Sequence, residues 1–245
     1  LQQNVASAKR VERGPHPSVD MQAYELLKSA HDRRQVMPPN FAGFTAKVTY
    51  KKDGKATNGT VTYHRQGKTE ISIAGLPEQE LRWVEDKLLN QIGHRRGGDF
   101  NDGDGRYALS LGKGAPNSFG TLIELNDGMK SSYRVKDRTV TEVTRTAGGT
   151  RFTISVLETQ EADAGKYLAN HFMVSYRDEK TGALQMIEGY RDTYAKVDGV
   201  WLPLARIVVT SGAVDPTAEP VVTMQSIRLS DIQLLPAERS ANLSQ

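Results

Sequence analysis

The 245-residue chain contains no cysteine. This absence excludes disulfide bonds, metal sites built from thiolates and catalysis by a cysteine nucleophile. The chain also has no run of 18 apolar residues, so the sequence predicts no transmembrane segment. Hydrophobic residues make up 38% and charged residues 25% of the chain, which is ordinary for a globular protein with a sizeable core.

An excess of charge of one sign is missing as well. The formal net charge is +3, and the densest basic stretch is GHRRGG at Gly93–Gly98. No basic stripe interleaved with stacking aromatic side chains occurs, although such a stripe is typical of nucleic-acid-binding proteins. We therefore predict no nucleic-acid partner, and we interpret the basic stretch as solvated surface.

Familiar catalytic and metal-binding motifs are also absent. There is no G-x-S-x-G nucleophile elbow, no Walker A loop and no G-x-G-x-x-G between a strand and a helix. The five histidines show no metal-ligand spacing, and the Asp-rich stretch Asp99–Tyr107 fails the calcium-loop pattern where Gly103 and Ser110 stand. We predict no catalytic residue, no metal ligand and no cofactor, while a hydrolase-type site assembled from scattered residues stays open.

The chain begins with the polar stretch LQQNVASAKRVERGPHP and not with methionine. This stretch has no hydrophobic centre, so it is not itself a signal peptide. We interpret residues 1–17 as a flexible lead-in left after a signal peptide has been removed, which predicts a periplasmic or secreted protein. Residues 18–236 are predicted to form a single domain, followed by a flexible tail at residues 237–245.

Two segments carry helical periodicity. The first, Ser18–Arg34, has one apolar face, and Ser18 is in position to cap its start. The second, Leu76–Gly93, has Pro77 at the first helical position, glutamates in the first turn and Gly93 as its stop. Two helices are therefore expected, with a strand-rich region between them and a longer one after the second.

The other segments alternate between apolar and polar residues, as half-buried strands do. Phe44 to Lys51 alternate strictly, and similar segments continue as far as Leu235. Asp-Gly pairs, which favour hairpin turns, begin at residues 53, 102, 104, 127 and 198. The sequence thus predicts an α+β fold, mainly antiparallel β: a strongly curved half-barrel sheet of about 11 strands, with two helices covering the concave face.

One hairpin, Asp192–Val209, carries a tryptophan and a proline soon after its Asp198-Gly199 turn. Pro203 cannot donate a ladder hydrogen bond, which predicts an edge, an end or a bulge at this position. Trp201 either closes the mouth of the curved sheet or belongs to the ordinary core.

The stretch NFAGFTAKVTYKKDGKATNGTVTYH, the stretch YAKVDGVWLPLARIVV and the order of elements together resemble the LolA-like lipoprotein carriers of bacterial envelopes. The chain is more closely similar to an uncharacterised bacterial family of unassigned function, which shares F-x-G-F/Y-T-A-x-V-T-Y, here Phe41–Tyr50. The resemblance covers most of residues 18–235. It implies a half-closed antiparallel barrel capped by helices, with an apolar interior that shields acyl chains, but it transfers no functional residue.

These observations predict a non-catalytic envelope protein that binds a lipid, an acyl chain or a lipid-modified partner such as a lipoprotein between the sheet and its helices. The candidate ligand contacts, chosen for apolar surface on inward faces, are Phe44, Val48, Tyr63, Ile73, Trp83, Leu88 and Trp201. A protein-interaction or scaffold module with a filled core is the first alternative, and the scattered-site hydrolase is the second. The sequence leaves the oligomeric state open.

Overall fold

The structure is a computed structural model of the chain and describes residue 16, residues 18–212 and residues 221–236. The predicted tail and all of the predicted lead-in except residue 16 lie outside the described residues.

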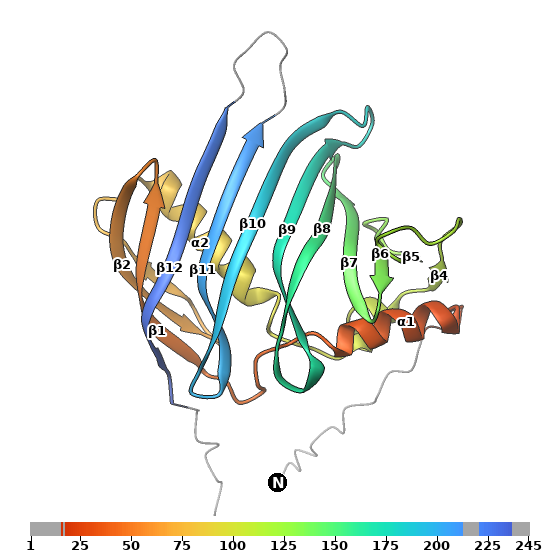
Figure 1. The fold of residues 1–245 in the computed structure, drawn as a ribbon, viewed down its shortest axis with the longest axis horizontal. Helices are drawn as coiled ribbons and strands as arrows, with labels where there is room; N and C mark the ends of the chain where they lie inside the picture. The colour runs from red at the N-terminus through yellow and green to blue at the C-terminus, as the bar shows by residue number, and fades with distance from the viewer. Residues whose placement is uncertain (1–15, 17, 213–220, 237–245) are drawn as a thin grey trace, which may run out of the picture.

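Two α-helices and twelve β-strands form the described part of the chain, together with short 3-10 turns (Figure 1). The helices are α1 (Met21–Asp32) and α2 (Glu78–Gly93). The 3-10 turns are η1 (Phe100–Asp102), η2 (Asp104–Arg106) and η3 (Asp163–Gly165). The strands are β1 (Gly43–Lys52), β2 (Lys55–His64), β3 (Glu70–Ser72), β4 (Leu109–Leu111), β5 (Thr121–Leu125), β6 (Ser132–Lys136), β7 (Thr139–Ala147), β8 (Thr150–Glu161), β9 (Tyr167–Asp178), β10 (Leu184–Val197), β11 (Val200–Gly212) and β12 (Val222–Leu234).

All twelve strands belong to one open sheet in the order β3-β2-β1-β12-β11-β10-β9-β8-β7-β6-β5-β4. Every neighbouring pair is antiparallel. From β4 to β12 the order follows the sequence, whereas the N-terminal strands join the sheet through the pairing of β1 with β12. The predicted curved, mainly antiparallel α+β fold is confirmed, with twelve strands where about eleven were expected.

Two of the five Asp-Gly pairs form the expected tight turns between strands. Asp53 and Gly54, with φ of 49° and 80°, join β1 to β2, and Asp198 and Gly199, with φ of 46° and 83°, join β10 to β11. Glycine takes such positive φ values without strain. The pairs at 102 and 104 lie instead in η1 and η2, because the side chain of Asp99 caps a 3-10 turn there.

Pro203 lies at a β-bulge in the middle of the sheet. The pairing of β10 with β11 shifts between Thr193, which faces Ala205, and Tyr194, which faces Pro203. This shift confirms the bulge alternative, in a strand that is flanked by both β10 and β12. Pairing of β11 with β12 begins only at Ala205. Pro203 has no backbone N–H to donate, and at this position no hydrogen bond of the β11–β12 ladder needs one.

Both helices begin later than the sequence indicated. Asp20, not Ser18, caps α1, and its side chain accepts hydrogen bonds from the backbone nitrogens of Gln22 (2.9 Å) and Ala23 (3.2 Å). A carboxylate at this position also interacts favourably with the positive end of the helix. Pro77 stands at the N-cap of α2 and not at its first helical position.

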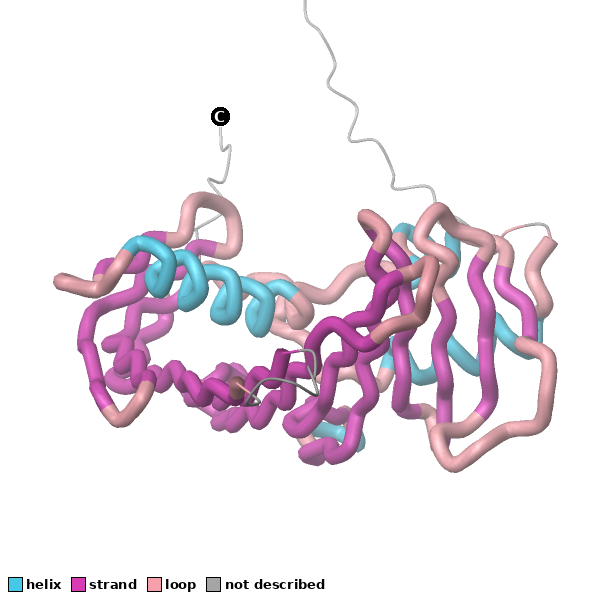
Figure 2. The backbone as a smooth tube through the Cα atoms, turned by 90° about the horizontal axis from the view of Figure 1, so that it is seen from above, coloured by secondary structure: helices cyan, strands magenta, loops and turns pink. Residues whose placement is uncertain are grey.

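The helices cover different parts of the concave face (Figures 1 and 2). Figure 1 shows α2 behind β11 and β12, and α1 beside the lower ends of β6 and β7. One core cluster, which includes Phe44 and Tyr63, packs under α2, and a second, which includes Leu27 and Ile123, packs under α1 and η1. The sheet therefore carries two larger hydrophobic cores and, between them, a smaller cluster that includes Val208 and against which Trp83 of α2 also packs.

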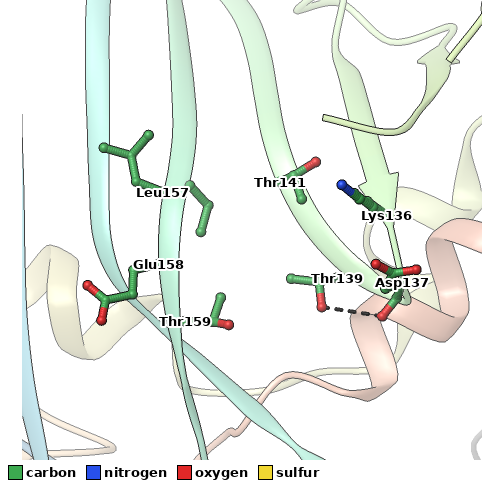
Figure 3. Close-up of a pocket in the computed structure, with 8 residues that line it drawn as sticks. Lys136, Asp137, Thr139, Thr141, Leu157, Glu158 and Thr159 are labelled. Atoms are coloured by element: carbon green, nitrogen blue, oxygen red, sulfur yellow. Dashed lines mark hydrogen bonds between the residues drawn. The ribbon is translucent and has the colours of Figure 1, made fainter. Parts of the chain in front are cut away.

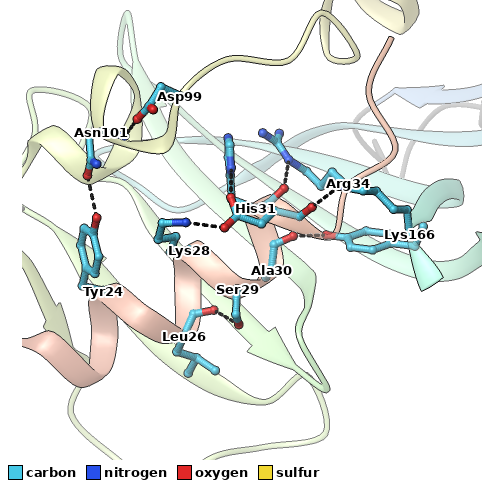
Figure 4. Close-up of polar contacts among 12 residues, drawn as sticks. Tyr24, Leu26, Lys28, Ser29, Ala30, His31, Arg34, Asp99, Asn101 and Lys166 are labelled. Carbon is cyan, nitrogen blue, oxygen red and sulfur yellow. Dashed lines mark hydrogen bonds and ion pairs between the residues drawn. The ribbon is translucent and has the colours of Figure 1, made fainter. Parts of the chain in front are cut away.

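Polar contacts hold α1 to the elements on either side of it (Figure 4). The Tyr24 hydroxyl donates to Oδ1 of Asn101 in η1 at 2.7 Å. At the other end of the helix, Lys166 donates from Nζ to the backbone oxygen of Asp32 at 2.6 Å. These contacts place the C-terminal end of α1, and Arg34 just beyond it, next to the start of β9.

Candidate functional site

The middle of the concave face, on β8, β9 and β10, lies between the two helix-covered cores. Its apolar and aromatic side chains form a surface that we call the central floor, which consists of Phe152, Ile154, Phe172, Val174, Tyr176 and Tyr190. Val174 and Tyr190 are each 6% exposed, whereas the other four side chains are only half-buried. The central floor is therefore an apolar surface that neither helix covers completely.

Strand register brings the central floor together across three strands. The facing pairs are Phe152 with Tyr176, Ile154 with Val174, and Phe172 with Tyr190. Because alternate residues of a strand point to the same side of a sheet, all six lie on the concave face. The rings of Phe172 and Tyr190 stack with their centroids 4.7 Å apart and their planes 10° from parallel.

A buried ion pair links the central floor to α2. Lys87 donates from Nζ to Oε1 of Glu188 and to the Tyr190 hydroxyl, both at 2.7 Å. Oε2 of Glu188 accepts from the hydroxyls of Tyr176 (2.9 Å) and Tyr190 (2.6 Å). Both oxygens of this carboxylate are thus occupied, which suits a link between helix and sheet and not a free general base.

The titration behaviour of these groups agrees with a structural link. Burial alone would raise the pKa of Glu188, but hydrogen bonds from Lys87, Tyr190 and Tyr176 outweigh it and the pKa is lowered. Burial and the adjacent carboxylate raise the pKa of Tyr176 and of Tyr190 above the usual range. The carboxylate therefore stays ionised at neutral pH and both phenols stay protonated.

A second buried ion pair follows on the same face of β10. Arg206 donates from Nε and Nη2 to the two oxygens of Asp192, at 2.8 Å and 2.7 Å, and from Nη1 to the backbone oxygen of Lys87 at 2.8 Å. Burial alone would lower the pKa of Arg206, but the bonds to Asp192 outweigh it and raise the pKa. This bidentate pair connects α2 to β10 and β11 with defined geometry.

Basic side chains approach the middle region from both halves of the molecule. His94, directly after α2, is exposed, yet desolvation and the charges of Arg206, Arg34 and Arg145 lower its pKa. These arginines belong to three separate elements: Arg206 to β11, Arg34 to the segment after α1 and Arg145 to β7. The charges of these arginines thus disfavour the protonated form of His94.

Five of the seven predicted ligand contacts lie in the core under α2. Their exposed fractions do not exceed 6%, and they are Phe44, Val48, Tyr63, Ile73 and Leu88. The other two, Trp83 and Trp201, are half-buried, and Trp83 packs against both this core and the central floor. As ligand contacts, all seven remain predictions.

Sequence reasoning identified the strands of the central floor but did not select its residues. The signal that could have found them is the alternation of large apolar side chains at Phe172, Val174 and Tyr176 on β9, facing Phe152 and Ile154 on β8.

Two surface hollows of the described structure lie beside the central floor. One of about 220 Å³ opens where β7 and β8 separate, beyond the last pair between them, Glu142 with Ser155 (Figure 3). Thr141 on β7 and Leu157 on β8 line its two sides. Another hollow lies over β1, β2 and β12. Neither includes a central-floor residue.

The Asp-rich segment Asp99–Gly105 packs against the core under α1. Phe100 is 3% exposed, and Oδ2 of Asp104 accepts a hydrogen bond from the Tyr133 hydroxyl at 2.7 Å. Among residues 16, 18–212 and 221–236 there is no group of three or more side chains placed to hold a metal ion. None of the helices in this part of the chain is long and apolar enough to cross a bilayer.

Comparison with protein families gives one match. The model of the family described as Protein of unknown function (DUF3386) matches residues 19–235. No curated protein matches the chain.

Comparison with solved structures gives distant likenesses. A "putative outer membrane lipoprotein-sorting protein domain" from Vibrio parahaemolyticus is 10% identical, with 90% of this chain and 95% of that chain covered and a TM-score of 0.30. A DUF1329 family protein from Desulfovibrio piger is 11% identical, with 94% and 95% covered and a TM-score of 0.25. A lipoprotein-sorting domain is thus among the structures found, as the sequence resemblance predicted. At such TM-scores these likenesses say nothing about a ligand.

Proposed function

The chain belongs to the DUF3386 family of proteins of unknown function, and we propose that it binds a lipid, or the acyl chain of a lipid-modified partner, on its central floor. The observation that carries this proposal is the half-buried apolar surface between two fully packed cores. Concave surfaces lined by aromatic and aliphatic side chains with a few polar groups are typical of ligand sites. The proposal includes a periplasmic or secreted location, which the sequence resemblance implies.

The dimensions of the central floor suit an elongated ligand. Phe172 and Tyr176 are four residues apart on β9, which corresponds to about 13 Å along the strand, and the three strands span roughly 10 Å. A chain with about ten buried methylene groups would contribute roughly 8 kcal/mol. This gain is within the range of the entropic cost of association, so the remaining affinity has to come from additional contacts.

The two ion pairs support an open central floor. Lys87 is bonded to Glu188 through its side chain and to Arg206 through its backbone oxygen. These bonds fix α2 at defined positions on β10 and β11, so the helix stays at the border of the floor when no ligand is present. A preformed surface of this kind avoids the cost of opening a closed core on binding.

Native mass spectrometry of the delipidated protein tests the proposal, with oleate and dioleoyl phosphatidylglycerol as probes. The expected result is uptake of one molecule per chain. The variant Ile154→Thr, which keeps a β-branched side chain but replaces apolar surface of the central floor with a hydroxyl, should weaken uptake at least tenfold. Met224→Thr is the matched control, because Met224 is exposed on the opposite face of the same sheet.

A wild-type protein that takes up neither probe would overturn the proposal and favour the interaction-module alternative. Equal loss of uptake in Ile154→Thr and Met224→Thr would also contradict it, because the loss would then not depend on the central floor.

A further inference from the structure

The buried face of α2 ends in polar side chains that lack hydrogen-bond acceptors. Val84, Leu88, Gln91 and Ile92 are the buried residues of the helix, and Arg95 continues this face just beyond its end. Gln91 is 3% and Arg95 is 5% exposed. Nε2 of Gln91 and both Nε and Nη1 of Arg95 are buried and have no partner among the described residues. Three donor groups are therefore enclosed here without acceptors.

The charge of Arg95 is not neutralised by a carboxylate of its own. Its Nη2 donates to the backbone oxygen of Trp201 at 2.6 Å, and its guanidinium lies 5.1 Å from the centre of the Tyr194 ring. Asp192 is nearby, but both of its oxygens already accept hydrogen bonds from Arg206. Burial accordingly lowers the pKa of Arg95, and the opposing effects of Tyr194 and Asp192 are smaller.

A buried cation with unsatisfied donors destabilises a fold, because it has lost its hydration without gaining full compensation. Such groups are rare in native structures and are retained mainly at functional sites. Arg95 and Gln91 do not belong to the two ion pairs that connect α2 to the sheet. No acceptor for these donors is found among the described residues, so the oxygens of a bound molecule could complete their hydrogen bonds.

Arg95 lies near one end of the central floor. Glu188, Tyr190, Asp192 and Tyr194 are alternate residues on the concave face of β10, and Arg95 lies over the last of them. The distance along the strand from Tyr190 to Tyr194 is about 13 Å. An amphiphile whose chain lies on the half-buried side chains of β8 and β9 would thus have to direct its head group toward Arg95 across the part of β10 that α2 covers.

The same end of the floor carries further polar groups. Arg34 adds positive charge near His94, whereas the charge of Arg206 is balanced by Asp192. A negatively charged head group would therefore meet both hydrogen-bond donors and a favourable potential.

We infer that Arg95 and Gln91 bind the anionic oxygens, from a carboxylate or a phosphate, of an amphiphile whose chain lies on the central floor. This inference rests on the proposed function and adds the chemical class of the head group. The sources differ in charge and size, so matched ligands with the same chain distinguish them.

The experiment compares oleate, oleoyl lysophosphatidate and uncharged oleyl alcohol by titration calorimetry. The wild-type protein should bind at least one of the two anions ten or more times more tightly than the alcohol. Arg95→Met and Gln91→Leu should remove most of this preference while they keep binding of the alcohol. Arg106→Met, at an exposed arginine on η2, is the control and should leave the preference unchanged.

Equal affinity of the wild-type protein for the alcohol and for both anions would overturn the inference and leave the proposed function intact. A preference retained in both variants would overturn it as well, and would mean that the donors bind enclosed water only. No binding of any of the three would overturn the proposed function and this inference with it. Thermal unfolding of Arg95→Met without ligand should show a midpoint no lower than that of the wild type, because methionine removes an uncompensated charge.

Discussion

The end of the sheet under α2 and the central floor are built from the same kinds of side chain in the same alternation. Under α2, Phe44 and Tyr63 are completely buried, whereas on the central floor Phe152 and Phe172 are half-buried. The difference lies in what covers them: a helix in one case and open space in the other. Alternation therefore identifies the inward face of a strand, but the position of the helices decides whether that face is core or ligand surface.

The largest expected effect is a difference in unfolding free energy between a variant in the core under α2 and a variant on the central floor. Phe44→Ala should lower the free energy of unfolding by about 3–5 kcal/mol, because a fully buried aromatic side chain is lost and a cavity remains. Urea denaturation of this variant and of Phe152→Ala measures the contrast, since Phe152 is already in partial contact with water. Equal losses in the two variants would remove the distinction between covered core and central floor.

The next largest loss of unfolding free energy is expected when the ion pair between Lys87 and Glu188, at the border of the two regions, is broken. Lys87→Met should cost about 3 kcal/mol, because it leaves the buried carboxylate of Glu188 without its cation. The double variant Lys87→Met with Glu188→Gln should recover much of this loss. If chemical denaturation shows the double variant to be as unstable as the single one, the pair does not determine the stability at this border.

The same pair predicts a dependence of stability on pH. The pKa of Glu188 is lower in the folded protein than its ordinary value, so its contribution is fully present above that ordinary value. It is lost as the pH falls through the lowered folded pKa. The decrease in unfolding free energy between about pH 5 and pH 3 should thus be smaller in the double variant than in the wild type.

A smaller difference in stability is expected between alanine substitutions of two glycines, one on β2 under α2 and one on β10 behind the central floor. At Gly59 on β2, an added Cβ would lie 2.0 Å from the backbone oxygen of Ser72, so Gly59→Ala should cost on the order of 2 kcal/mol. At Gly189 on β10, the nearest atom to an added Cβ is 4.0 Å away, so Gly189→Ala should be neutral or slightly stabilising. Thermal unfolding midpoints of the two variants provide the test, and a reversed order would contradict the tight approach of β3 to β2.

The smallest effect is expected on the convex face behind the central floor. Met173, Val209 and Met224 are 37%, 40% and 61% exposed and lie in one row across β9 to β12. Met224→Thr should change the free energy of unfolding by no more than about 0.5 kcal/mol. A larger loss would show that this face is covered in solution, which analytical ultracentrifugation of the wild-type protein would then reveal as self-association.

Much of the fold could be predicted from local patterns. The apolar periodicity of residues 18–34 and 76–93 located both helices, and the Asp198-Gly199 pair located one hairpin. The same rule was wrong at residues 102 and 104, because the cap formed by Asp99 is a side-chain contact that composition does not reveal. The pairing of β1 with β12 was also beyond local reasoning, since it joins the two ends of the described chain.

The candidate site was less predictable than the fold. Its polar links join residues that are far apart in sequence: Lys87 and Glu188 are separated by 101 positions, and Arg95 and Trp201 by 106. No spacing rule connects such pairs. The predicted contacts Phe44 and Tyr63 were chosen by apolarity alone, and this criterion also selects the best-packed core.

The position of β12 determines the order in which the sheet can be completed. Its hydrogen bond from Gln225 to the Tyr50 hydroxyl spans 175 residues, and β12 is the only strand among the described residues that connects β1 to β11. While the chain is being synthesised, the first hairpin and α2 therefore have no place on the growing meander until the last strand has left the ribosome. Contacts of such long range slow folding, so the β1–β2 hairpin can join the rest of the sheet only after the C-terminal strand has been made.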